Sequence, residues 1–162
     1  MSAGDNTIGL SESNLQRIEA RKARYQHPQS VLLEALWMWQ EEHGWISEEG
    51  MRYIGDLVGV PYHHVLGAVT FYTMFNRKPV GRHKLEVCTN VSCMLRNSES
   101  ILKHIEDRLQ IKTGETTNDN RFTLVEAECL GSCGTAPVMQ VGDRYYENLD
   151  ASKVDKILDD LK

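Results

Sequence analysis

Four cysteines in two short-spaced pairs constrain this chain more than any other feature of its 162 residues. Cys88 and Cys93 form one pair with four residues between them, and Cys129 and Cys133 form the other with three. Each pair follows a segment with the pattern of a β-strand, KLEVC at residues 84–88 and FTLVEA at residues 122–127. If both strands end at one edge of a sheet, two neighbouring loops offer two thiols each.

Two cysteine pairs on adjoining loops suit a [2Fe–2S] cluster, because its rhombic core needs two terminal ligands on each iron. Gly131 and Gly134 let the backbone approach sulfur closely. Asn90, Ser92 and Ser132 are small polar neighbours whose hydrogen bonds would stabilise the charge added on reduction. The predicted ligands of this single cluster, one pair on each iron, are Cys88, Cys93, Cys129 and Cys133.

Other uses of four cysteines stay open at this point. A structural zinc site also takes four thiolates, although its pairs usually have the tighter C-x2-C spacing. Two disulfides would need an oxidising compartment, and a dithiol oxidoreductase would need C-x-x-C at a helix start, which neither pair provides. The C-x2-C-x2-C run that is common in four-iron clusters is absent.

Charge and hydropathy narrow the class of protein further. The formal net charge of −5 disfavours a nucleic-acid partner, because phosphate binding needs clustered Lys and Arg. No apolar run approaches the roughly twenty residues of a membrane span, so direct membrane insertion is not expected. The segment Met1–Leu10 has neither a basic nor an apolar stretch of a secretory signal. We therefore expect a cytoplasmic protein with reduced thiols, held at the inner membrane only through partners.

The first half of the chain has helical patterns. Ser11 or Ser13 can cap a first helix that ends before Pro28. A second helix is expected over residues 29–43 with Gly44 as its stop, a third over 47–59, and a fourth from Pro61 to about residue 75. The apolar stripe at the end of the fourth helix, which includes Phe71 and Phe75, is more typical of core than of a docking surface.

The pattern changes near residue 80, after a turn-rich connector at residues 76–81. The expected order beyond it is a strand at 84–88, a helix around 101–109, strands at 122–127, 137–141 and 144–146, and a last helix capped by Asp150 or Ser152. We therefore predict an α+β protein with two domains. Residues 1–80 form an N-terminal helical bundle, and residues 81–162 form a thioredoxin-like α/β domain with a mixed sheet.

Several segments resemble the family of [2Fe–2S] ferredoxin subunits of NADH:quinone oxidoreductase, respiratory complex I. The resemblance spans most of the sequence and is strongest at the second cysteine pair. The matching segments are Ala35-Leu36-Trp37, Gly44-Trp45-Ile46, residues 67–75 (GAVTFYTMF), residues 121–124 (RFTL), residues 129–133 (CLGSC) and Ala136-Pro137-Val138.

The resemblance implies a helical region followed by a thioredoxin-like [2Fe–2S] ferredoxin, with the four cysteines above as cluster ligands. It also implies a subunit of an oxidoreductase that exchanges single electrons with the flavin of an NADH-oxidising partner. FMN and NADH are expected on that partner only, since the sequence has no G-x-G-x-x-G and no P-loop. Soluble NAD-linked hydrogenases and formate dehydrogenases contain similar subunits, so they stay as alternative hosts, and a zinc-stapled scaffold is a more remote one.

Acidic residues near the cysteines predict a low reduction potential. Glu86, Glu126 and Glu128 flank the strand ends, whereas Arg96 is the one basic residue close in sequence to either pair. Thiolates and sulfides already make the oxidised site anionic, and nearby carboxylates oppose the addition of an electron.

Overall fold

The computed structural model describes residues 9–161 and divides into two compact units, Met1–Pro79 and Val80–Lys162. The expectation for the segment Met1–Leu10 falls almost wholly on residues 1–8, which lie outside the described residues. Across residues 9–161, no helix has the length and apolar character needed to cross a membrane. Each unit has its own hydrophobic core and is described separately below.

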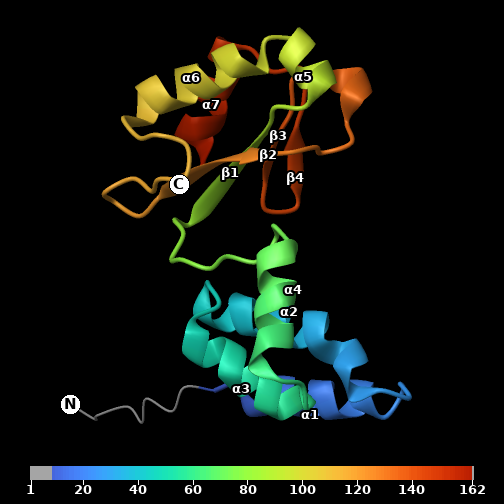
Figure 1. Cartoon of the computed structure of the whole chain (residues 1–162). Helices are drawn as coiled ribbons and strands as arrows, with labels where there is room; N and C mark the ends of the chain where they lie inside the picture. Colours follow the sequence, from blue (N-terminus) through green and yellow to red (C-terminus); the bar gives the residue numbers. More distant parts are fainter. Residues whose placement is uncertain (1–8, 162) are drawn as a thin grey trace, which may run out of the picture. The chain divides into compact units, whose positions relative to one another are not determined.

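The first unit is helical. Ser11 caps its first helix by accepting a hydrogen bond from the Asn14 N–H, and Ser47 caps the third by accepting one from the Gly50 N–H. Gly44 and Gly59 end two helices with positive φ angles of 81° and 77°, which glycine adopts without steric cost. The elements are α1 (Glu12–Lys22), a 3-10 turn η1 (Pro28–Val31), α2 (Leu32–His43), α3 (Glu48–Val58) and α4 (Tyr62–Phe71) (Figure 1).

The core of the helical unit is closely packed around Trp39, whose side chain is 2% exposed. Gly50 faces this ring, and a Cβ atom at that position would lie 2.5 Å from the indole. Ile18, Leu36 and Ile54 are fully buried in the same cluster. These are the apolar positions that the helical spacing predicts, so this packing follows from the sequence pattern.

The end of the fourth helix differs from the prediction. The α4 helix stops at Phe71, so the next residues leave the helical register instead of continuing its apolar stripe. Phe75 turns back through a hydrogen bond from its N–H to the Tyr72 carbonyl and is buried. Phe71, Tyr72 and Met74 are exposed, with Phe71 77% accessible, so the core interpretation is wrong for these three.

The second unit contains one mixed four-stranded sheet with the order β2-β1-β3-β4. The first two strands are parallel with Leu85 opposite Leu124, and the other two pairs are antiparallel. The strands are β1 (His83–Cys88), β2 (Phe122–Ala127), β3 (Met139–Val141) and β4 (Arg144–Tyr146), and the helices are α5 (Val91–Leu95), α6 (Ser98–Leu109), the 3-10 turn η2 (Cys133–Thr135) and α7 (Ala151–Asp160). The α+β class and the mixed sheet are confirmed.

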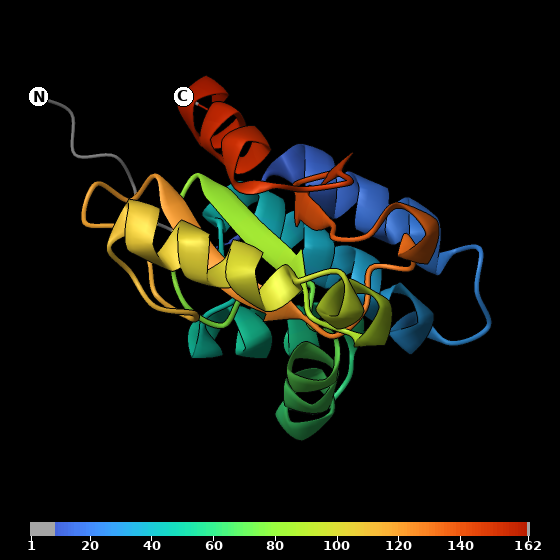
Figure 2. The same ribbon diagram turned by 90° about the horizontal axis from the view of Figure 1, so that it is seen from above.

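The long helices of this unit, α6 and α7, lie side by side and share a core with the sheet (Figure 1 and Figure 2). His104 on α6 contacts Asp155 on α7 at 2.9 Å, and Arg108 reaches Asp159 at 3.2 Å. Arg121, just before β2, donates hydrogen bonds to the carbonyls of Leu158 and Leu161 at the end of α7. Strand β2 is therefore held at its start by the last helix and at its centre by the core.

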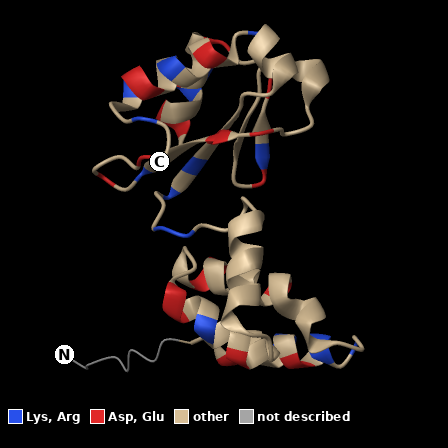
Figure 3. Ribbon diagram, viewed as in Figure 1, with Lys and Arg blue, Asp and Glu red and all other residues tan. Residues whose placement is uncertain are grey.

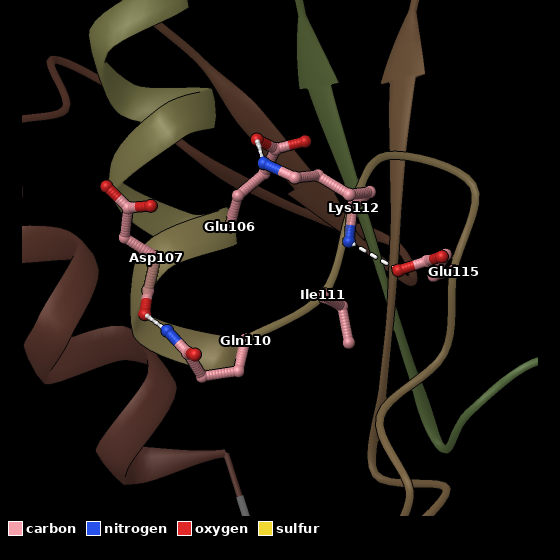
Figure 4. A pocket seen from close by; sticks show the side chains of 6 residues that line it. All are labelled: Glu106, Asp107, Gln110, Ile111, Lys112 and Glu115. Carbon is pink, nitrogen blue, oxygen red and sulfur yellow. Dashed lines mark hydrogen bonds and ion pairs between the residues drawn. The ribbon is translucent and has the colours of Figure 1, made fainter.

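A pocket lies where the polypeptide leaves α6, away from the cysteines (Figure 4). Its acidic groups already have partners, since the Lys112 ammonium lies 2.9 Å from Glu106 and the Lys112 N–H donates to Glu115 at 2.7 Å. The contact with Lys112 lowers the pKa of Glu106. These pairings close the turn between α6 and β2, and they leave the pocket a structural feature. Its lining residues are Glu106, Asp107, Gln110, Ile111, Lys112 and Glu115.

Candidate iron–sulfur site

The parallel pair β1 and β2 brings the two cysteine loops to one edge of the sheet. Cys88 is the last residue of β1 and lies opposite Ala127, the last residue of β2. The Thr89 N–H donates to the Ala127 carbonyl at 3.2 Å, and the Cys88 N–H donates to the Val138 carbonyl at 3.1 Å. The segment that leaves β1 is thus held between the exits of β2 and the approach to β3.

Cys88 and Cys93 form the buried side of the site. Their side chains are 3% and 2% exposed and pack with Ala136 and Val138 in a small apolar cluster. A short helix, α5, carries Cys93, and its start is capped by the side chain of Asn90, which accepts from the Val91 N–H at 2.8 Å. Sequence reasoning missed this helix, since five residues are too few to show a helical period.

The thiol of Cys93 is tuned by this burial. Burial raises its pKa, the hydrogen bond with Cys88 raises it further, and the nearby Cys133 acts in the same direction. The structure therefore brings these three cysteines together. Because the thiolate is the metal-binding form, Cys93 must lose its proton when it binds iron.

Cys129 and Cys133 form the exposed side of the site. Cys129 follows the end of β2, and Cys133 opens the 3-10 turn η2. Gly131, between them, has a φ of +75°, and a Cβ there would meet nothing within 4 Å, so backbone conformation is what favours glycine. The Ala136–Pro137 peptide bond that follows the loop is cis, as proposed from the thioredoxin-like pattern.

The exposed loop is held by the segment that follows β4, a contact that the sequence did not reveal. Glu147 accepts hydrogen bonds from the hydroxyls of Ser132 and Thr135, and the Tyr145 hydroxyl donates to the Leu130 carbonyl at 2.9 Å. The hydroxyl proton of Ser132 is therefore directed at Glu147 and not at sulfur. Twelve to fifteen residues separate these partners, so no local pattern pointed to them.

Charged side chains stand back from both cysteine loops. Residues 89–95 and 129–138 contain no Asp, Glu, Lys or Arg, and these loops are uncoloured in the charge view (Figure 3). Glu128 directly precedes Cys129 and is exposed. Glu86, by contrast, lies 2.9 Å from the Lys84 ammonium, which offsets its charge. Of the three carboxylates in the sequence-based prediction of a low potential, Glu86 thus contributes less than expected.

The donor set fits a [2Fe–2S] cluster. All four candidate donors are thiols, two on each of two adjoining loops, and each iron of such a cluster takes only two protein ligands. Within residues 9–161, no three His, Cys, Asp or Glu side chains form a group placed to hold a single metal ion. Two ligand pairs do not require such a group, since bridging sulfides complete the coordination of each iron.

Known proteins with similar sequences share both units of this chain. The model of the thioredoxin-like [2Fe–2S] ferredoxin family matches residues 18–162. A subunit of the NADH-quinone oxidoreductase of Rhizobium meliloti (strain 1021) is 46% identical over 147 residues, which cover 91% of this chain and 88% of that protein. The corresponding NADH-quinone oxidoreductase subunit of Rickettsia prowazekii (strain Madrid E) is 38% identical over 156 residues, covering 94% and 88%.

Among solved structures, an NAD+-reducing [NiFe]-hydrogenase in the H2-reduced state shares the fold. The two structures superpose with a TM-score of 0.70 at 20% identity, over 81% of this chain. The matched region corresponds to only 22% of that longer hydrogenase chain. At this identity the likeness concerns the fold alone.

Proposed function

The chain belongs to the thioredoxin-like [2Fe–2S] ferredoxin family, and on that premise we propose that it is the [2Fe–2S] electron-transfer subunit of an NADH-quinone oxidoreductase. The observation that carries this proposal is the 46% identity to a subunit of that enzyme, which extends over 91% of the chain and thus includes the helical unit. Within it, we propose residues 1–80 as a helical domain and residues 81–162 as the ferredoxin domain.

The proposed ligands of the single cluster are Cys88, Cys93, Cys129 and Cys133. Their support is the parallel register of β1 and β2, which brings both loops to one edge, and the hydrogen bond between Cys88 and Cys93. One pair is assigned to each iron. The first pair comes from the apolar cluster with Ala136 and Val138, and the second from the exposed loop.

The residues around the cysteines divide the work between shielding and access. When bound, the cluster supplies single-electron chemistry. Cys88 and Cys93 hold it against a dry, uncharged surface, where electrostatic interactions are strong. Cys129 and Cys133 lie on the exposed side, the side from which an electron donor can approach. The protein therefore acts as a carrier, without a substrate site of its own.

The proposed partner is the flavin-bearing, NADH-oxidising subunit of the same complex. Support comes from the names of the relatives, which are subunits of NADH-quinone oxidoreductases, and from the absence of nucleotide-binding motifs in this sequence. FMN and NADH are assigned to that partner. Contact with the inner membrane is assigned to the assembled complex, through other subunits.

Metal analysis with optical and paramagnetic resonance spectra of anaerobically purified protein tests this function. We expect about two irons and two sulfides per chain, a visible [2Fe–2S] spectrum and a one-electron signal on reduction. Electron uptake from NADH should require the flavin subunit. A colourless, zinc-loaded and redox-silent protein would contradict the proposal and support the zinc scaffold. Copurification with a hydrogenase or formate dehydrogenase, and not with a quinone oxidoreductase, would change the host complex.

Replacing the exposed Glu128 by glutamine should raise the reduction potential of the cluster. The carboxylate directly precedes Cys129, and its removal lessens the repulsion felt by an added electron. A single charge near a partly solvated site has an effect on the order of tens of millivolts. The measurement is a redox titration followed by the cluster spectrum.

The matched control for this titration is Asp107→Asn, which removes an exposed carboxylate near the end of α6. It should leave the potential almost unchanged, because exposed charges beyond a screening length of roughly 10 Å contribute little. A Glu128→Gln protein with an unchanged or lowered potential would contradict the electrostatic account.

A further inference from the structure

The exposed ligand loop depends on contacts from outside itself for its shape. Residues 128–132 belong to no helix or strand, and η2 is a single 3-10 turn. Inside the loop, the Thr135 N–H donates to the Ser132 carbonyl at 3.2 Å. Both Cys129 and Cys133 are exposed, so hydrophobic burial does not fix their side chains as it fixes Cys88 and Cys93.

The segment Tyr145–Asn148 supplies those outside contacts. One oxygen of Glu147, Oε1, accepts from the Thr135 hydroxyl at 2.6 Å and from the Ser132 hydroxyl at 2.5 Å. The Asn148 N–H donates to the Thr135 carbonyl at 2.7 Å. Together with the Tyr145 hydroxyl on the Leu130 carbonyl, these bonds tie the loop at three of its residues.

The charge state of Glu147 suits this role. Its two hydroxyl donors, Ser132 first and then Thr135, lower its pKa, and Lys153 acts in the same direction. An ionised carboxylate accepts hydrogen bonds and donates none, and charge-assisted bonds are stronger than neutral ones. No charged residue lies within the loop itself, at 129–138, to compete for these hydroxyls.

We propose that Glu147 is a positioning residue, which holds the loop at residues 129–135 in the conformation that lets Cys129 and Cys133 bind the second iron together. It acts through Ser132 and Thr135 and touches neither the cluster nor a substrate. Groups that orient metal ligands in this way commonly change metal retention when they are removed. The inference rests on the proposed function and on the proposed ligand set.

The test compares Glu147→Ala with Glu147→Gln in the full chain. The glutamine keeps an oxygen that can accept from both hydroxyls, while the alanine leaves them without this acceptor. We expect Glu147→Ala to lose its cluster to an iron chelator about tenfold faster than the unaltered protein, and Glu147→Gln to stay within about twofold. The readout is the anaerobic decay of the visible spectrum, which does not depend on enzyme activity.

A double variant, Ser132→Ala with Thr135→Val, removes the donors and keeps the charge. It should lose the cluster as fast as Glu147→Ala, and adding Glu147→Ala to it should have little further effect. Equal loss rates for Glu147→Ala and the unaltered protein would overturn the inference. So would equal acceleration in Glu147→Gln and Glu147→Ala, which would indicate an effect of charge alone.

A second readout is independent of the cluster. In cluster-free protein, Glu147→Ala should speed amide hydrogen exchange at Thr135 and Asn148, whose N–H groups are bonded at this contact, and Glu147→Gln should restore it. Unchanged exchange at both amides would overturn the inference. A failure of the proposed function is distinguishable from this, because there the unaltered protein itself would contain no [2Fe–2S] cluster.

Discussion

Replacing Cys133 by alanine is expected to abolish stable cluster binding. Iron should fall from about two per chain to a trace, and the one-electron signal should disappear with it. Cys133 is well suited to this experiment because it is exposed, whereas Cys88 and Cys93 also pack in an apolar cluster. Loss of the cluster from the Cys133→Ala protein therefore reports a lost ligand and not a damaged core.

Two measurements accompany this variant. Cluster-free Cys133→Ala should unfold at the same temperature as the cluster-free unaltered protein, since an exposed thiol contributes little to packing. Met94→Ala, which truncates an exposed side chain one residue after Cys93, should keep its cluster. A Cys133→Ala protein with full iron content and an unchanged spectrum would remove Cys133 from the ligand set.

Replacing Leu124 by alanine should have the largest effect on the stability of the second unit. Leu124 lies at the centre of β2, is 0% exposed and pairs with Leu85 in the parallel register. The cavity left by a buried leucine lowers the free energy of unfolding by roughly 2–5 kcal/mol. Chemical denaturation followed by far-ultraviolet circular dichroism measures the loss.

The control in the same strand is Val125→Ala, whose side chain is only half-buried and should cost clearly less. All three tryptophans, Trp37, Trp39 and Trp45, lie in the helical unit, so tryptophan fluorescence follows that unit separately. If Leu124→Ala costs no more than Val125→Ala, the described packing of β2 is incorrect.

The sequence predicted most of the secondary structure because its signals are local. Capping by Ser11, Ser47 and Asp150 is confirmed, as are the glycine stops at Gly44 and Gly59. The misses lie where local patterns are ambiguous. The helix expected from residue 29 begins as the 3-10 turn η1, and the strand expected from residue 137 begins at Met139. Exposure of Phe71 depends on where α4 stops, which its apolar stripe did not indicate.

The site was predictable in its ligand types and less so in its surroundings. Cysteine spacing after two strands indicated the four thiols, and the parallel register explains why both loops meet at one edge. Which thiols are buried depends on the missed helix α5 and on Val138, so spacing alone could not separate Cys93 from Cys133. The contact of Glu147 with the loop arises from folding across β3 and β4 and has no local signature.

The parallel pairing of β1 and β2 also bears on how the protein is made. Cys88 and Cys93 are synthesised first, and the helix α6 and a long turn intervene before Cys129 and Cys133 follow. Parallel strands joined by such a crossover pair late, because loop closure precedes any reward from contacts. A nascent polypeptide therefore holds only half of the proposed ligand set until β2 has docked. Cellular iron–sulfur assembly factors would then have to deliver the cofactor to an already folded unit, through its exposed cysteine loop.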